Sequence, residues 1–160
     1  MIGCLEGGNT PAQVMEIPLQ TPECVDSLVS ISLFDVVGSY SPVSDLPYDK
    51  MTGVFKLDYQ TARHMALNGK RLAGIRIRGD AMAPILLDGD WVIIDCDDQN
   101  YARAGVFLIW ANGEFVLKRV QRMTGGKVYL ISDNSMYQAE MFGVEEVSKI
   151  EVVGRVRMRL

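Results

Sequence analysis

Apolar and polar residues alternate through most of the chain after Arg71. In the run 71–78 (RLAGIRIR), Ile75 and Ile77 fall on one face, and the two arginines beside them fall on the other. This period of two is typical of a half-buried β-strand. Five further runs follow, WVIID, VFLIW, EFVLKRVQR, KVYLIS and KIEVVGRVRMRL, separated by the turn-like stretches DDQN, ANG and TGG. The pattern predicts a mainly β domain of antiparallel strands.

The first 70 residues predict fewer regular elements. The run 31–37 (ISLFDVV) predicts a strand, and residues 38–47 predict a loop. A short helix is predicted over 59–67, with Asp58 as its N-cap and Asn68-Gly69 as its stop. Residues 1–30 show no sustained period and are interpreted as a linker or hinge arm, which leaves residues 31–160 as one domain.

The final run ends with Arg155, Arg157 and Arg159 alternating with apolar residues. Two interpretations of this terminal strand are open. It pairs with its own copy across a two-fold axis, or it completes its own sheet, which is the commoner outcome.

Composition narrows the class of protein. With 160 residues, 48% of them hydrophobic, the chain fits one domain with a core. No apolar run approaches the ~18 residues of a membrane helix, and the features of a signal peptide are missing, so we expect a cytoplasmic protein with no membrane contact. Three cysteines without a CxxC pair and a single histidine predict no disulfide framework, no metal and no cofactor.

The net charge of −4 is unevenly distributed. Residues 1–49 contain seven acidic residues and no Lys or Arg, so this part is a poor phosphate binder. The remaining residues carry all 16 basic residues interspersed with 13 acidic ones. This mixture favours a solvated surface over a DNA-binding patch.

Lys118 is the first candidate for chemistry. In EFVLKRVQR it shares a strand face with Val116 and Val120, while Leu117 and Arg119 point the other way. Apolar surroundings disfavour an ammonium ion, and desolvation lowers a lysine pKa from about 10.4 toward the range in which the neutral amine acts as a general base. The alternative is that this strand lies at a sheet edge and the lysine extends to water.

The turn 79–89 adds a second candidate. Gly79 permits a tight exit from the preceding strand, Pro84 suits the first turn of a short helix, and Asp88-Gly89-Asp90 returns the chain to WVIID. A small residue at the start of such a helix is placed where a nucleophilic hydroxyl could sit beside backbone N–H groups. The residue present is Ala81, which has no nucleophile.

Four segments in order resemble one known family. The stretch GDAMAPILLDGDWVIID resembles the GDSM-x-P-x-x-x-DGD segment of the self-cleaving domains of LexA and phage repressors, which share their core with UmuD. EFVLKRVQR is similar to the family's lysine strand, 37 residues after Ala81, ISDNSMY to its SDN-x-x-Y segment, and EVVGRVRMRL to its terminal strand. The resemblance covers about Ser30 to Leu160 and implies a LexA-like β-rich C-terminal domain with short helices.

The resemblance implies a role for each matching position. Ala81 stands at the position of the family's nucleophilic serine, and Lys118 at that of the general base that takes the serine proton. In the family the serine attacks a peptide bond in the chain's own linker, and a backbone amide holds the oxyanion. With Ala81 this route is closed, so we expect the chain to be inert. Ala81 is either an engineered replacement of serine or a natural loss of self-cleavage.

The cleavage site implied by the resemblance is Val37-Gly38, which lies 43 residues before Ala81. The family usually cuts Ala-Gly or Cys-Gly, but Ala73-Gly74 lies in a predicted strand and Ala104-Gly105 lies downstream. A branched valine at the bond is atypical, and the alternative is that Gly38 merely ends a strand.

Taken together, the resemblance predicts the C-terminal regulatory and dimerisation domain of a phage-type or SOS-type transcriptional repressor. We expect a homodimer that binds operator DNA through an N-terminal helix-turn-helix domain, which we do not find in residues 1–30. The expected regulators are a RecA filament or an antirepressor. The alternatives are a UmuD-like translesion polymerase accessory, a naturally non-cleaving repressor domain, and a signal-peptidase relative, against which the missing membrane anchor argues.

Overall fold

The computed structural model describes residues 27–35, 51–111 and 113–160. They fall into two compact units. The described part of the smaller unit comprises residues 27–31 and 56–69. The larger unit includes residues 32–35, 51–55 and 70–160 without 112, and it holds both Ala81 and Lys118.

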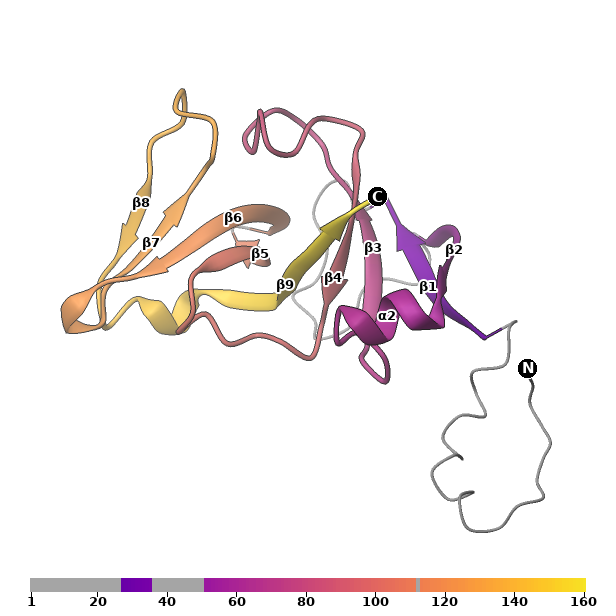
Figure 1. Cartoon of the computed structure of the whole chain (residues 1–160). Helices are drawn as coiled ribbons and strands as arrows, with labels where there is room; N and C mark the ends of the chain where they lie inside the picture. The colour runs from indigo at the N-terminus through magenta and orange to yellow at the C-terminus, as the bar shows by residue number, and fades with distance from the viewer. Residues whose placement is uncertain (1–26, 36–50, 112) are drawn as a thin grey trace, which may run out of the picture. The chain divides into compact units, whose positions relative to one another are not determined.

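The strands form one mixed sheet in the order β2-β1-β3-β4-β9-β5-β6-β7-β8 (Figure 1). The prediction of a mainly β fold with short helices is therefore confirmed. The strands are β1 (Leu28–Phe34), β2 (Met51–Asp58), β3 (Leu72–Arg76), β4 (Trp91–Asp95), β5 (Gly105–Ala111), β6 (Glu114–Arg122), β7 (Val128–Ile131), β8 (Glu140–Phe142) and β9 (Glu151–Arg159). The helical segments are α2 (Tyr59–His64), η4 (Thr124–Gly126) and η5 (Val147–Lys149).

The start of the sheet differs from the expected antiparallel arrangement. β1 runs parallel to β3, with Ser32 opposite Ala73 and Phe34 opposite Ile75. β1 also begins and ends three residues before the predicted strand 31–37. β2 was not expected, because the run MTGVFKLD contains Gly53 and lacks a clean apolar alternation. Local pattern indicates that a strand forms but does not specify its partner.

The second half of the chain follows its pattern closely. The observed β4 and β6 coincide with WVIID and EFVLKRVQR, and the ends of β3, β5, β7 and β9 shift by a few residues at most. β9 pairs with β4 on one side and β5 on the other. The pairing with β4 covers Arg155–Arg159 and the pairing with β5 covers Glu151–Arg155, so β9 takes part in its own sheet, and pairing with a second copy stays a prediction.

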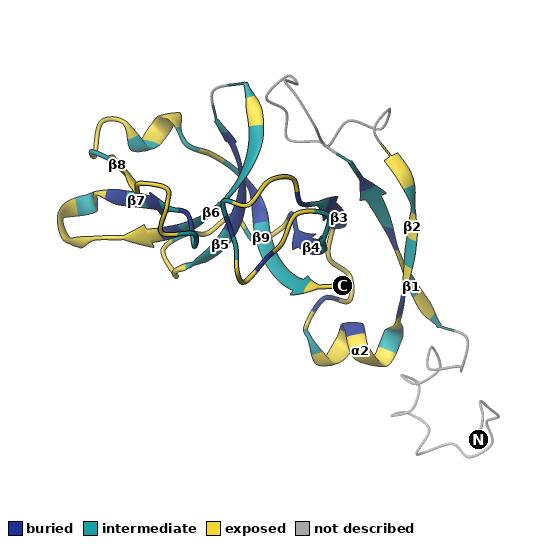
Figure 2. Ribbon diagram, turned by 90° about the horizontal axis from the view of Figure 1, so that it is seen from above, coloured by how far each residue is buried: buried dark blue, intermediate teal, exposed yellow. Residues whose placement is uncertain are grey.

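Side chains of the larger unit are buried on both faces of the central strands. Neighbouring residues of β5 show this: Leu108 belongs to one apolar cluster with Val92 and Ile94, whereas Phe107 belongs to another with Val120. Figure 2 shows the buried positions concentrated on the strands in the middle of the sheet. Central strands are therefore apolar on consecutive residues, as the runs WVIID and VFLIW indicate.

The smaller unit contains the predicted helix. The Asp58 carboxylate accepts hydrogen bonds from the backbone N–H groups of Gln60 and Thr61, at 3.2 and 2.7 Å. This confirms Asp58 as the N-cap and lowers the pKa of its carboxyl. The helix ends at His64, three residues before the predicted end, and Ala66 then takes a positive φ of 56°. His64 itself is exposed.

Candidate functional site

The turn between β3 and β4 is closed by its acidic residues. Gly79 and Gly89 have φ values of 83° and 89°, which a residue with a Cβ rarely adopts. The Asp88 carboxylate accepts a hydrogen bond from the Gly79 N–H at 2.7 Å, and the Asp90 carboxylate accepts one from the Leu87 N–H at 2.8 Å. The two glycines and two aspartates thus fix both ends of the turn.

The interior of this turn differs from the prediction. Residues 81–85 form consecutive turns with a cis Ala83-Pro84 peptide bond, and the expected short helix does not form. Met82 and Leu86 are buried, at 2% and 5% exposure, and the Leu86 N–H donates to the Met82 carbonyl. These two apolar residues anchor the turn in the core.

Ala81 lies partly buried at the start of these turns. Its carbonyl oxygen accepts a hydrogen bond from the Asn134 N–H at 3.0 Å. The N–H groups of Ala81 and Met82 donate to no described residue.

Lys118 is held from two sides. Its Nζ donates a hydrogen bond to the Ser132 hydroxyl at 3.0 Å and forms an ion pair with the Glu140 carboxylate at 3.3 Å. Lys118 is carried by β6, which lies between β5 and β7 in the sheet. Only 15% of the lysine side chain is exposed. The alternative of an edge-strand lysine extending to water is thus excluded by the fold.

The side chain of Lys118 lies in a groove of about 270 Å³. The predicted face of β6 is confirmed, because Val116 lines the same groove and Leu117 packs on the other cluster. The remaining lining is apolar with a few charged groups, and comprises Ile109, Ala111, Glu114, Leu130, Glu140, Phe142, Lys149 and Ile150.

The segment 132–137 connects this lysine with the turn. Ser132 is 4% exposed and receives the Lys118 hydrogen bond. Two residues later, Asn134 contacts Ala81 through its backbone, and its side-chain amide donates to the Asp80 carbonyl at 3.0 Å. The lysine and the turn at position 81 therefore both contact the segment 132–134. Figure 1 shows the 79–90 and 132–139 loops rising at the same end of the sheet.

Two further contacts fix the same segment. Asp133 accepts two hydrogen bonds from the Arg119 guanidinium, at 2.6 and 2.7 Å, which raises the pKa of Arg119. The Tyr137 hydroxyl donates to the Asp80 carboxylate at 2.5 Å, and this bond raises the pKa of Tyr137. Sequence reasoning matched ISDNSMY to the family but assigned these side chains no contacts.

The predicted cleavage position, Val37-Gly38, lies outside the described residues. The last described residue before it, Asp35, is ion-paired with Arg78 and lies 3.7 Å from the Arg76 guanidinium. Arg78 directly precedes the turn that carries Ala81.

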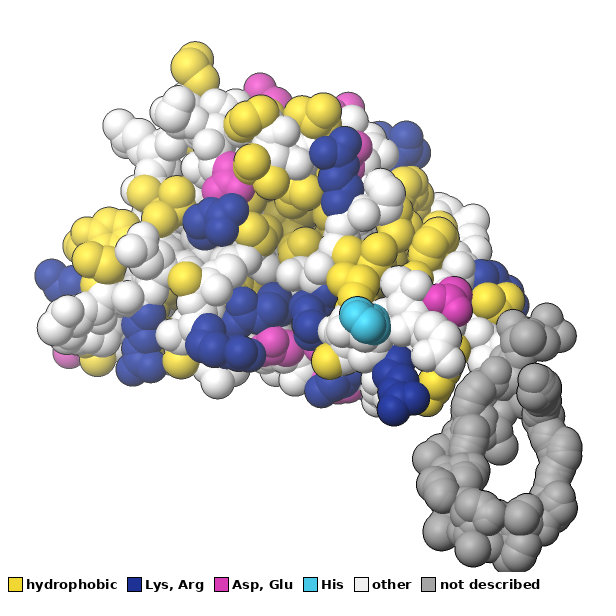
Figure 3. Space-filling view, viewed as in Figure 1, with side chains coloured by type: hydrophobic (Ala, Val, Ile, Leu, Met, Phe, Trp, Pro, Cys, Tyr) yellow, Lys and Arg dark blue, Asp and Glu magenta, His cyan; other side chains and the backbone are white. Residues whose placement is uncertain are grey.

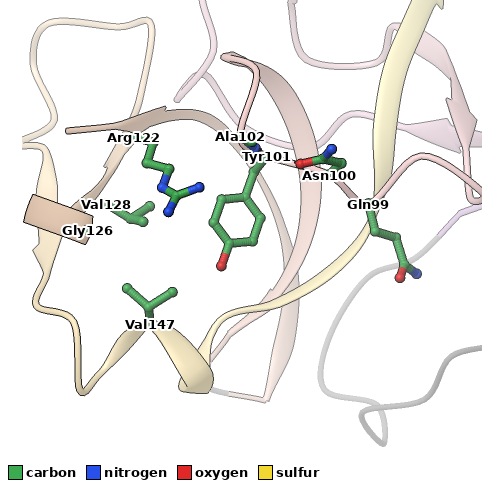
Figure 4. A pocket seen from close by; sticks show the side chains of 8 residues that line it. All are labelled: Gln99, Asn100, Tyr101, Ala102, Arg122, Gly126, Val128 and Val147. Carbon is green, nitrogen blue, oxygen red and sulfur yellow. Dashed lines mark hydrogen bonds between the residues drawn. The ribbon is translucent and has the colours of Figure 1, made fainter. Parts of the chain in front are cut away.

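A second cavity, of about 320 Å³, contains none of the predicted site residues. Figure 4 shows Tyr101 and Arg122 directed into it beside Val128 and Val147. The rest of its lining comes from residues 99–102 and Gly126. The candidate site is therefore the groove at Lys118 with the turn at Ala81.

The charged surface is mixed, as expected from composition. Figure 3 shows Lys and Arg side chains beside Asp and Glu side chains on the face drawn. In β9 all three arginines pair with aspartates, and Arg157 reaches the buried Asp95 at 3.1 Å. No group of three or more His, Cys, Asp or Glu side chains suited to a metal occurs among the described residues. Within that same part, no helix is long and apolar enough to cross a membrane.

These features define a β-rich domain in which a partly buried lysine and a glycine-bounded turn are connected through residues 132–134. A family model described as peptidase S24-like matches residues 45–157. The chain belongs to this family, and the resemblance to the LexA, UmuD and phage-repressor domains is confirmed. No curated protein matches the chain.

Sequence reasoning missed Ser132, Asn134 and Glu140 as contacts of the site. The SDN-x-x-Y spacing was a signal for the first two, because a polar cluster directly after an apolar strand is placed to bond neighbouring loops. Glu140 gave no signal, since its partner is 22 residues away and its own strand has only three residues.

Proposed function

We propose that this chain is the C-terminal regulatory and dimerisation domain of a transcriptional repressor of the phage or SOS type, with its Ser-Lys self-cleavage site disabled at Ala81. The observation that carries the proposal is the hydrogen-bonded connection from Lys118 through residues 132–134 to the turn at Ala81.

The chemistry requires a serine at position 81. Its hydroxyl proton passes to neutral Lys118, and its oxygen attacks the carbonyl carbon of the scissile bond. The resulting oxyanion accepts hydrogen bonds from the N–H groups of residues 81 and 82. The lysine then returns the proton to the leaving amine, and water releases the acyl group from the serine. With Ala81 the first step has no nucleophile, so the domain keeps its linker intact.

An Ala81→Ser chain tests this function. We expect it to break into two fragments at Val37-Gly38 during incubation between pH 7 and 10, with and without an activated RecA filament, as measured by intact mass. The unaltered Ala81 chain is the matched control and should remain whole. An Ala81→Ser chain that remains whole under all conditions contradicts the self-cleavage part of the proposal.

The second candidate is a natural non-cleaving domain controlled by a protein antirepressor. Exposed apolar side chains beside the site favour it, since Met136 is 87% exposed and Met141 is 51% exposed. Surface methionines of this kind are used by adaptable binding surfaces. This candidate predicts that the Ala81→Ser chain is not cleaved and that it sediments as a dimer. The alternative is a UmuD-like accessory role. It predicts that Ala81→Ser restores cleavage and that the protein does not bind operator DNA.

A further inference from the structure

We propose that the second cavity, of about 320 Å³, is a binding site for a small organic acid. The carboxylate of the ligand contacts Arg122 and Tyr101. Its apolar body lies against Val128 and Val147. The cavity shares no lining residue with the groove at Lys118, so this inference goes beyond the proposed function and does not depend on self-cleavage.

The cavity contains one charged side chain, and that charge has no partner in the described part of the chain. Among the described residues that line the cavity, Arg122 alone is charged. Arg119 on the same strand pairs with Asp133, whereas Arg122 donates to no described residue. A guanidinium presents a planar fork of N–H donors that matches the two oxygens of a carboxylate. Arg122 is therefore placed to receive an anion from solution.

The hydroxyl of Tyr101 is a second polar group of this cavity. Figure 4 shows its ring and the Arg122 side chain both directed inward. The Tyr101 hydroxyl forms no hydrogen bond with a described residue. A phenol can donate to a carboxylate oxygen, and a hydrogen bond to an ionised acceptor is stronger than one between neutral groups.

The loop that carries Tyr101 is fixed without a ligand. The guanidinium of Arg155 donates to the main-chain carbonyls of Asn100 and Arg103, at 3.0 Å each. Asn100 Oδ1 accepts a hydrogen bond from the Ala102 N–H at 2.9 Å. Tyr101 lies between these contacts. Binding to a preformed site costs less ordering of side chains and loops, which favours recognition of a small ligand.

The opposite wall of the cavity is apolar. Val128 is buried in the apolar cluster that contains Phe107, and Val147 packs against the same cluster. The volume of about 320 Å³ is near the lower limit of ligand pockets, which span about 300–1,000 Å³. These two features indicate a ligand with a compact apolar body, of the size of benzoate.

The single charge of the cavity favours a carboxylate over a phosphate. A phosphate monoester carries a charge of about −1.5 to −2 at pH 7. The lining offers one guanidinium and no second cation, so part of this charge would stay uncompensated. A carboxylate carries one negative charge, which Arg122 matches.

The first test measures binding of benzoate to the unaltered chain by NMR at constant ionic strength. The methyl resonances of Val128 and Val147 should shift along a saturable curve with a Kd on the order of 1 mM, as expected for so small a ligand. Benzamide has the same shape without the charge and should bind about tenfold or more weakly. Benzamide that binds as tightly as benzoate would overturn the role of the carboxylate.

The second test compares variants of the cavity. Arg122→Gln should weaken benzoate binding about tenfold or more, and Tyr101→Phe about two- to tenfold. Arg63 is a matched control, because it is also an exposed arginine and lies on α2 in the smaller unit. Arg63→Gln should bind benzoate as the unaltered chain does. The melting temperature of each variant shows whether the fold is retained.

Phenyl phosphate and inorganic phosphate complete the comparison, and we expect both to bind more weakly than benzoate. Phenyl phosphate that binds more tightly would overturn the assignment of a carboxylate. Inorganic phosphate that binds as tightly as benzoate would show a site for any anion and overturn the organic acid. No saturable shift with benzoate up to about 20 mM, or an unchanged affinity in Arg122→Gln, would also overturn the inference. None of these results bears on cleavage of the Ala81→Ser chain, so the two proposals are tested separately.

Discussion

The side-chain amide of Asn134 donates a hydrogen bond to the main-chain carbonyl of Asp80 at 3.0 Å, although the two residues lie 54 positions apart. This bond fixes the turn that carries Ala81 to the segment that begins at the Lys118 partner, Ser132. The separation of Ala81 and Lys118, the proposed nucleophile position and general base, therefore depends in part on Asn134.

Removal of this bond should misplace the turn. In the Ala81→Ser background we expect Asn134→Ala to slow cleavage about tenfold or more, because displacements of about 1 Å cost large factors in rate. The exposed Gln138 offers a matched control, and Gln138→Ala should cleave at the parent rate. Time courses by intact mass provide the measurement. Equal rates for all three chains would show that the Asn134 contact does not position the site.

The paired Asp133 and Arg119 should contribute to stability. We expect Asp133→Asn to lower the free energy of unfolding by about 1 kcal/mol, as measured in urea. The value is at the low end for bonds between charged groups, because the Arg119 side chain is 41% exposed. The exposed Glu145 serves as control, and its replacement by Gln should leave the unfolding midpoint in place. A midpoint unchanged by Asp133→Asn would contradict the assignment.

Gly154 should be the least replaceable glycine of the sheet. A Cβ at this position would lie 2.5 Å from the Asp95 carbonyl oxygen and 2.7 Å from Ile94 Cγ2, beside the irregular register of β5 and β9. We expect Gly154→Ala to lower the free energy of unfolding by about 1–3 kcal/mol. A Cβ at Gly53 would have its nearest atom 4.0 Å away. Gly53→Ala should therefore change the free energy of unfolding by less than about 0.5 kcal/mol. Equal effects at both positions would rule out close approach as the cause.

Asp58 should make stability depend on acid pH. Its pKa is lowered in the folded chain by the hydrogen bonds from Thr61 and Gln60, so the carboxylate contributes stability above its unfolded value of 3.8. That contribution is lost as the pH falls below about 4 and through the lower folded pKa. Asn is also a good N-cap but does not titrate. Urea midpoints from pH 2 to 6 should therefore fall more steeply for the parent than for Asp58→Asn, and parallel curves would contradict this role.

Local pattern was sufficient to predict a strand where its apolar residues form an uninterrupted or alternating run. The runs at β4 and β6 were predicted with their bounds, because burial on one or both faces is written into consecutive residues. The parallel pairing of β1 with β3 was missed, since nothing local encodes a partner some 40 residues away. β8 was missed because three residues carry no period.

The sequence singles out the two principal positions of the candidate site but not the contacts that connect them. Ala81 and Lys118 were singled out by motif and spacing, and the structure brings their segments together through Asn134 and Ser132. The ion pair of Lys118 with Glu140 arises only from the return of β8 along β7. Such contacts depend on the tertiary fold and leave no local trace.

The most direct test of a Ser-Lys site is whether cleavage needs the lysine. The initial cleavage rate of Ala81→Ser at pH 9 should be compared with that of Ala81→Ser with Lys118→Met, which keeps the length and apolar stem of the side chain. We expect loss of the general base to lower the rate by a factor of about 100 or more. Cleavage of both chains at the same rate and bond would contradict the account, because the lysine would then take no part in the reaction.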